Sequence, residues 1–299
     1  MRFSPAFLEL SRRSMYTAAT LASIVEGVDS RPSGPVIDIG AGDGFLTELL
    51  VNQITNSAPM LAIDIDDFAK PLERGVRRLK ANGANLPLRD QSVGLAATHF
   101  VLSRVHEIEA TKIVHEISRV LVNGGQALIL EPCLGMSTYH SMSNSYAGSL
   151  AAIARRTKAR LQQHVGVNEN IGLVCPALLQ GAGLTITLTD LHIAKWFTAF
   201  PDIDPPDIEW LQRRAESLER QSSVDFMYAH TSRGGQLSDE ISLIEDDGNQ
   251  LLLTESGFLE LREGRVGDIR RKLDDLERGV DSVGPVEFIP VVRVIAKKI

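Results

Sequence analysis

Cysteine is scarce in this sequence, which has only Cys133 and Cys175 among its 299 residues. The two lack metal-type spacing and are too few for a disulfide framework, so we expect two thiols in a reducing cytoplasm. Long apolar runs are lacking as well, since nothing approaches the ~18 consecutive apolar residues of a membrane-spanning helix. The first sixteen residues combine Arg and Ser without a long apolar stretch, which excludes a secretory signal and leaves a mitochondrial transit peptide as a weaker alternative. We therefore expect a cytoplasmic chain with no membrane segment.

Clusters of basic side chains are missing too. The chain has 31 Lys and Arg against 38 Asp and Glu, a net charge of -7, and its basic residues are scattered among acidic ones. A protein that binds a polyanion normally displays clustered Lys and Arg. We therefore expect no nucleic acid as substrate or partner. His, Asp and Glu also show no metal-ligand spacing, so no metal is expected.

The order of the apolar runs predicts an α/β fold. From residue 35 to about 132, short β-like runs alternate with helix-like stretches, which is typical of a parallel sheet with crossover helices. In this part we predict strands over 36–39, 60–65 and 94–100, a short strand ending near 81, a strand over 126–130 after a turn at 123–125, and helices over 45–54, 68–80 and 111–121. Farther along we predict a loop over 134–146, helices over 149–163 and 171–180, a strand over 184–189 and a last strand over 288–295.

A long insertion, residues 196–285, separates the last two predicted strands. We expect residues 1–195 and 286–299 to form one α/β core, with residues 1–30 as an N-terminal helical cap. The insertion would then serve as a substrate lid or as an interface.

Three glycines at alternate positions, Gly40, Gly42 and Gly44, separate the first predicted strand from its helix. Glycine lets the backbone turn tightly and approach a ligand, and the helix behind it presents free N–H groups. Asp64 ends the next predicted strand, twenty positions after Gly44, where a carboxylate can accept both ribose hydroxyls. No Gly-Lys-Ser/Thr follows, which excludes a P-loop. The alternation also differs from Gly-x-Gly-x-x-Gly, so a nicotinamide dehydrogenase is a weak alternative.

Residues 38–44, Asp-Ile-Gly-Ala-Gly-Asp-Gly, resemble the D/E-x-G-x-G-x-G signature of class I S-adenosylmethionine-dependent methyltransferases. Residues 82–93 resemble that family's segment after the third strand, and residues 117–132 resemble its approach to the fifth strand, which commonly ends in Gly-Gly and then Glu-Pro. The resemblance covers about residues 30–195 and the last strand, and it is closest to the subfamily that methylates quinones, sterols and natural products. It implies a Rossmann-like fold whose seven-stranded, mostly parallel sheet has helices on both faces and an antiparallel last strand.

The resemblance also implies an S-adenosylmethionine site built from several segments. Asp38 and the backbone of 40–44 would hold the methionine part of the cofactor, Asp64 the ribose, and Ile65 would pack on adenine. Asn82 would face the adenine edge, although the family usually has Asp at this position. The cofactor residues that we predict are Asp38, Gly40, Ala41, Gly42, Gly44, Phe45, Asp64, Ile65, Asn82, Gly83, His99 and Tyr16. Plainer alternatives exist: Asp38 as a helix-capping or turn-stabilising carboxylate, Asp64 as a surface residue and Asn82 as a turn residue.

Methyl transfer from a sulfonium is an in-line displacement, in which the enzyme aligns the nucleophile, excludes water and sometimes removes a proton. Parallel sheets bind ligands beyond the carboxyl ends of their strands, so residues after the fourth and fifth strands are the candidates. His106 is the first candidate for a base and His140 the second, because imidazole titrates near neutrality. Substrate contacts are predicted for Arg104, Tyr139 and Tyr146. The alternatives are a solvated His106 at a helix start, His140 on a mobile loop and Arg104 in a surface ion pair.

Together these features predict a methyltransferase that uses S-adenosyl-L-methionine to methylate O, N or C of a small, apolar metabolite. Its partner would be that small-molecule acceptor, and a homodimer stays open. Two alternatives remain: a methyltransferase-fold protein that binds the cofactor but catalyses another step, such as cyclisation, and a non-catalytic scaffold. The segment 204–207, Asp-Pro-Pro-Asp, resembles the motif of nucleobase amino-methyltransferases, but it does not follow the fourth strand, so we regard the match as accidental.

Overall fold

The chain divides into two compact units in the computed structural model. The first, which we call the core unit, comprises residues 4–136, 165–194 and 289–299, and the second unit comprises residues 1–3, 137–164 and 195–288. The structure describes residues 16, 18–54, 58–66, 75–136, 138–140, 168, 170–196 and 286–299, with scattered positions between 212 and 278. Nearly all described elements belong to the core unit.

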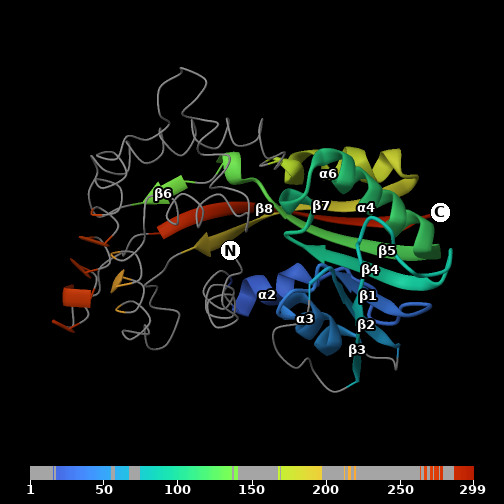
Figure 1. Ribbon diagram of the computed structural model, residues 1–299, viewed down its shortest axis with the longest axis horizontal. Helices are drawn as coiled ribbons and strands as arrows, with labels where there is room; N and C mark the ends of the chain where they lie inside the picture. The colour runs from blue at the N-terminus through green and yellow to red at the C-terminus, as the bar shows by residue number, and fades with distance from the viewer. Residues whose placement is uncertain are drawn as a thin grey trace. The chain divides into compact units, whose positions relative to one another are not determined.

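The core unit is built on a mostly parallel sheet (Figure 1). Its strand order is β3 (Val76–Lys80), β2 (Met60–Asp64), β1 (Val36–Ile39), β4 (Val93–His99), β5 (Leu121–Pro132) and β8 (Val286–Lys298), and β7 (Leu184–Trp196) also pairs with β8. The first five strands in this order are parallel to one another. β8 runs antiparallel to β5, from Gln126 opposite Lys297 to Pro132 opposite Val291. The predicted seven-stranded sheet with an antiparallel last strand is confirmed.

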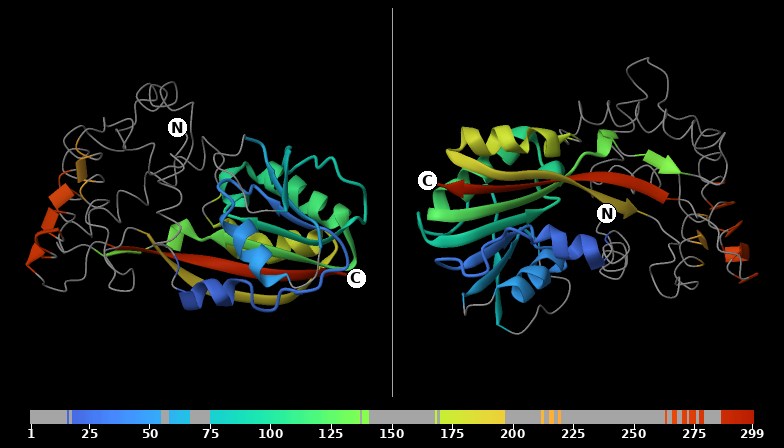
Figure 2. Two further views of the ribbon diagram at one scale, coloured as in Figure 1. Left: turned by 90° about the horizontal axis from the view of Figure 1, so that it is seen from below. Right: turned by 180° about the vertical axis from the view of Figure 1, so that it is seen from behind.

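Helices cover both faces of this sheet. α4 (Glu107–Val120) and α6 (Ile171–Gly181) lie on one face, and α2 (Ala18–Ile24) and α3 (Phe45–Gln53) lie on the other (Figures 1 and 2). Two short 3₁₀ helices, η1 (Leu102–Arg104) and η2 (Leu134–Met136), follow β4 and β5. The N-termini of α3 and α4 therefore lie at the edge where β1 and β4 end, which is where ligands bind in parallel sheets.

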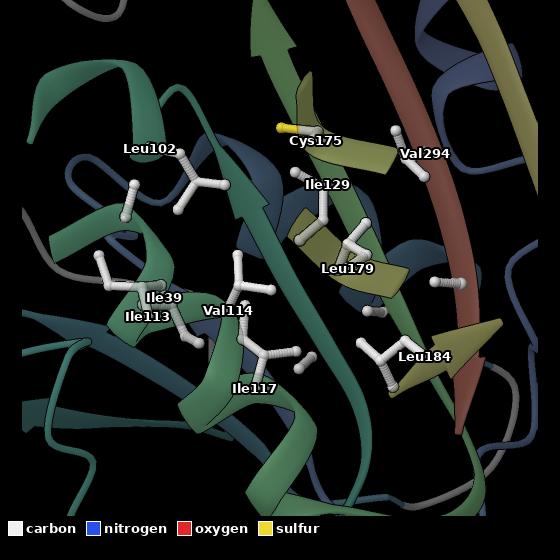
Figure 3. Packing of buried hydrophobic residues seen from close by; sticks show 14 of the residues in the cluster. Ile39, Leu102, Ile113, Val114, Ile117, Ile129, Cys175, Leu179, Leu184 and Val294 are labelled. Carbon is white, nitrogen blue, oxygen red and sulfur yellow. The ribbon is translucent and has the colours of Figure 1, made fainter. Parts of the chain in front are cut away.

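The core between the sheet and its helices has the pattern expected of an amphipathic helix. In α4, Ile113, Val114 and Ile117 are buried at helical spacing. They pack with strand residues such as Ile129 and with Leu179 of α6 (Figure 3). The same layer contains both cysteines, which are free thiols, and burial raises the pKa of each.

Two sequence predictions are corrected in this fold. The helix predicted over 68–80 is wrong for residues 76–80, which form β3, while residues 68–74 lie outside the described part. β3 is the outermost strand on its side, and its polar side chains Arg77, Arg78 and Lys80 are exposed, which an edge strand tolerates. The loop predicted over 134–146 contains η2 and an eighth strand, β6 (Thr138–His140), which pairs antiparallel with residues 286–288 of β8.

Strand and helix ends shift modestly elsewhere. The predicted turn at 123–125 lies inside β5, where the register against β4 shifts and Gly124 has a φ of +82°. α4 begins at Glu107, four residues before the predicted start, because His106 caps it. Residues 197–285 lie between β7 and β8, and their role as a lid or interface stays a prediction. None of the helices within the described ranges has the length and apolar character needed to cross a bilayer.

Candidate functional site

The turn between β1 and α3 has the backbone that its alternating glycines predict. Gly40, Gly42 and Gly44 have φ values of +70°, +54° and +87°, in the left-handed region that side chains disfavour. A Cβ added to Gly40 would lie 2.4 Å from Cγ2 of Val101, which follows β4. Gly44 is the N-cap of α3 and has no side chain to offer its first N–H groups. The turn thus presents bare backbone and a helix N-terminus at the carboxyl edge of the sheet.

A buried carboxylate, that of Asp38, supports this turn from below. Asp38 is 1% exposed, and the Thr47 hydroxyl of α3 donates to its Oδ2 at 2.6 Å. The bond ties β1 to α3 across the glycine turn, as the structural alternative for Asp38 foresaw. Asp43, which the sequence reasoning missed, is also buried, and its Oδ1 accepts the N–H of Phe45 at 3.4 Å. Buried acids in this position need such donors, since an unpaired buried charge is costly.

Asp64 at the end of β2 contacts the glycine turn directly. Its Oδ2 accepts the N–H of Gly42 at 2.8 Å, and its Oδ1 accepts the N–H of Asp66 at 2.9 Å. An ionised carboxylate has about four acceptor positions, so these two bonds leave capacity for further donors. Ile65, the next residue in the chain, is an apolar side chain that is 63% exposed.

The segment after β3 lies against the same edge. The N–H of Ala81 donates to the carbonyl oxygen of Asp64 at 2.8 Å, which joins the exits of β2 and β3. The Oδ1 of Asn82 accepts the N–H of Ala84 at 2.8 Å, so Asn82 does form the turn that was its plainer alternative. A Cβ on Gly83 would lie 2.8 Å from Cγ2 of Ile39, the residue before Gly40. The structure therefore gathers the predicted adenine segment, Asp64 and the glycine turn.

Four rings from three segments form an aromatic cluster at the end of β4: Tyr16, Phe45, His99 and Phe100. The Tyr16 hydroxyl lies 2.9 Å from Nε2 of His99, and both residues are buried. Phe45 stacks on Tyr16 with a centroid distance of 5.6 Å, and Phe100 stacks on His99 at 4.1 Å. Three residues predicted separately as cofactor contacts are thus in mutual contact beside the start of α3.

The turn after β4 is held by Glu131 of β5, a residue without a predicted role. Burial raises the pKa of the Glu131 carboxyl, against the opposing effect of the backbone N–H groups of Leu102, Ser103 and Val101. Arg104 at the end of η1 is partly exposed; burial lowers the pKa of its guanidinium, and the charge of Glu131 opposes that shift. Arg104, a predicted substrate contact, therefore lies near the buried carboxylate of Glu131.

The candidate bases are placed less favourably than the cofactor residues. His106 is exposed, and its Nδ1 accepts the N–H of Ile108 at 3.4 Å as the N-cap of α4. This is the solvated helix start that was its alternative, and a role as base stays a prediction. His140 and Tyr139 belong to β6, but their side chains lie outside the described residues, as does the whole of Tyr146. In the part of the chain that the structure describes, no three His, Cys, Asp or Glu side chains form a group that could hold a metal ion.

Comparisons with known proteins give one family-model match and several similar solved structures. Residues 37–129 match a family model described as a methyltransferase domain. Among solved structures, a Bacillus halodurans C-125 protein classed provisionally as a methyltransferase has a TM-score of 0.48 at 12% identity, over 94% of this chain and 99% of that protein. The YcgJ protein of Bacillus subtilis has a TM-score of 0.47 at 15% identity, over 93% and 97% of the two chains. The cyclase SpnF has a TM-score of 0.45 at 15% identity, over 93% and 80%.

No curated protein matches the chain. The strand order and the glycine turn define a class I, Rossmann-like fold. Within it, residues 37–129 match the methyltransferase-domain model, and the fold is the Rossmann-like fold that the sequence resemblance implies.

Proposed function

We propose that this protein transfers a methyl group from S-adenosyl-L-methionine to O, N or C of a small-molecule acceptor. The observation that carries the proposal is the contact between Asp64 and the glycine turn. Oδ2 of Asp64 bonds to the N–H of Gly42, so the predicted ribose and methionine subsites share one piece of backbone. The left-handed glycines themselves add no side chain to that backbone.

The residues present fit an adenosyl amino acid. Gly40, Gly42 and Gly44 supply a left-handed backbone without side chains, and the α3 N-terminus behind Gly44 favours a carboxylate such as that of the methionine moiety. Asp64 would accept the ribose hydroxyls, and exposed Ile65 would pack on adenine. The bound cofactor would supply the electrophilic methyl group.

The chain's own residues would align the acceptor and exclude water. The cluster of Tyr16, Phe45, His99 and Phe100 forms a packed wall beside the helix start, which suits a site that must be dry. Where the acceptor must lose a proton, His106 is the proposed base; its Nδ1 accepts the N–H of Ile108, so base action requires this cap bond to open and free the Nδ1 lone pair. The acidic net charge and the scattered basic residues favour a small acceptor over nucleic acid.

Calorimetry with the full chain tests the cofactor assignment. We expect S-adenosylmethionine and S-adenosylhomocysteine to bind and NAD⁺ not to bind. Asp64→Asn should weaken S-adenosylhomocysteine about ten- to hundredfold, as expected when a charged acceptor is lost. Asp66→Asn is the matched control, because its backbone N–H, and not its carboxylate, bonds to Asp64. Binding of NAD⁺ alone would overturn the proposal.

Turnover separates methyl transfer from the alternatives. A methyltransferase converts S-adenosylmethionine to S-adenosylhomocysteine in the presence of its acceptor. We therefore expect a panel of phenols, quinones and amines to include at least one compound that gains a methyl group. A compound that is cyclised while the cofactor stays intact would instead favour the non-methylating alternative.

A further inference from the structure

A charged side chain lies fully buried between β5 and the turn that follows β4. Glu131 is 0% exposed. Its Oε1 accepts the N–H of Val101 at 2.8 Å and the N–H of Leu102 at 2.7 Å, and its Oε2 accepts the N–H of Ser103 at 3.0 Å. Three consecutive amides thus donate to one carboxylate, which offsets the cost of burying its charge.

The segment that Glu131 holds, residues 100–104, is here called the β4 exit turn. It begins with Phe100, whose φ of +57° is left-handed and strained for a residue with a side chain. The N–H of Phe100 donates to the carbonyl oxygen of Leu130 at 2.9 Å, and the buried side chain of Leu102 packs in the core (Figure 3). A strained turn persists only where the surrounding structure holds it. Glu131 supplies a large part of that hold, since it satisfies three donors at once.

The β4 exit turn contacts both parts of the candidate site. Cγ2 of Val101 approaches Gly40 so closely that a Cβ there would lie 2.4 Å away. The ring of Phe100 stacks on His99, which bonds to Tyr16. A shift of this turn would therefore move the glycine turn and the aromatic cluster together.

We propose that Glu131 is a positioning residue of the cofactor site, whose carboxylate fixes the β4 exit turn against the glycine turn and His99. This inference rests on the proposed function for its link to the cofactor, while the hold on the turn itself is independent of any ligand. Glu131 touches no reacting atom in this role. It acts through Val101 and Phe100.

The test compares Glu131→Gln with the wild-type full chain. Glutamine keeps the size of the side chain and one carbonyl oxygen, but its amide N–H groups face the N–H of Ser103. Glu26→Gln is the matched control, because it removes the same charge from an exposed side chain. Amide hydrogen exchange of residues 100–104 is measured without ligand, and the Kd for S-adenosylhomocysteine is measured by calorimetry at a temperature where circular dichroism shows all three proteins folded.

We expect exchange of residues 100–104 to become about tenfold faster in Glu131→Gln, and the Kd to rise about tenfold, while Glu26→Gln matches the wild type in both. A role confined to stability would lower the unfolding midpoint and leave the Kd of the folded protein unchanged. That result, or unchanged exchange in the β4 exit turn, would overturn the inference while leaving the proposed function in place. Failure of the wild type to bind S-adenosylhomocysteine would instead refute the proposed function, and with it the link between Glu131 and a cofactor.

Discussion

Replacing Gly40 by alanine separates two reasons for a glycine at one position. The first is conformational, because φ is +70° and a left-handed residue with a Cβ costs about 1–2 kcal/mol. The second is steric, because the new Cβ would lie 2.4 Å from Cγ2 of Val101 and 3.3 Å from its Cγ1. Valine is stiff at χ1, so the clash must move backbone, and overpacking of this kind costs about 1–3 kcal/mol. Gly40→Ala should therefore lower the free energy of unfolding by about 2–5 kcal/mol.

Gly124→Ala is the control for the conformational part. Gly124 also has a left-handed φ, +82°, but nothing lies within 4 Å of a Cβ built there. It should lose only about 1–2 kcal/mol. The excess loss in Gly40→Ala is then the steric part, which Val101→Ala should relieve in a double-mutant cycle. Urea denaturation of the four variants and the wild type measures these values. If Val101→Ala restores nothing to Gly40→Ala, the packing of the β4 exit turn on the glycine turn is refuted.

Two other predictions concern ion pairs. Arg119 donates to the carbonyl oxygens of Leu86 and Leu88 and to Glu116. Arg119→Lys should therefore lose about 1–3 kcal/mol of unfolding free energy and weaken S-adenosylhomocysteine binding. The exposed Arg89→Lys is the control, and an equal loss in both variants would contradict the prediction. Burial raises the pKa of Asp190, but the hydrogen bonds and charge of Arg293, together with His192, more than offset this and lower it. Stability from this pair is therefore present above the unfolded pKa of about 3.9 and is lost as pH falls through the lower folded value. Asp190→Asn should flatten the fall in unfolding free energy between about pH 5 and pH 2, and an unchanged acid profile would count against the pairing.

Local signals explain why the cofactor side of the site was predictable. β1 begins and ends where the sequence predicts, at residues 36–39. A strand buried on both faces consists mostly of apolar residues, so it is recognisable as a short apolar run. The left-handed glycines could be placed because few other residues tolerate that backbone. Asp64 follows from the same logic, since the end of the strand next to the glycine turn has one location in a parallel sheet.

Residues whose role depends on a partner far along the chain were not predictable in this way. Glu116 reads as a solvated position on α4, yet its Oε2 accepts the N–H of Leu86, thirty residues away, at 2.7 Å. Its carboxylate also pairs with Arg119, and that hydrogen bond chiefly lowers the pKa of Glu116. The periodicity of α4 shows which face is polar, but it cannot show that a loop folds back onto that face.

The aromatic cluster shows how both kinds of information combine. The resemblance assigns Tyr16 and His99 to the cofactor one at a time, and neither assignment contains the bond between them across 83 positions of sequence. Nε2 of His99 bonds to the Tyr16 hydroxyl, and the ring stacks on Phe100, so these contacts hold the His99 ring in the aromatic cluster. The exposed His106 accepts the N–H of Ile108 at Nδ1, so its neutral ring carries the proton on Nε2. The contacts of the ring nitrogens therefore separate the two residues: His99 is a buried member of the aromatic cluster, and His106 caps α4, while its role as base stays a proposal.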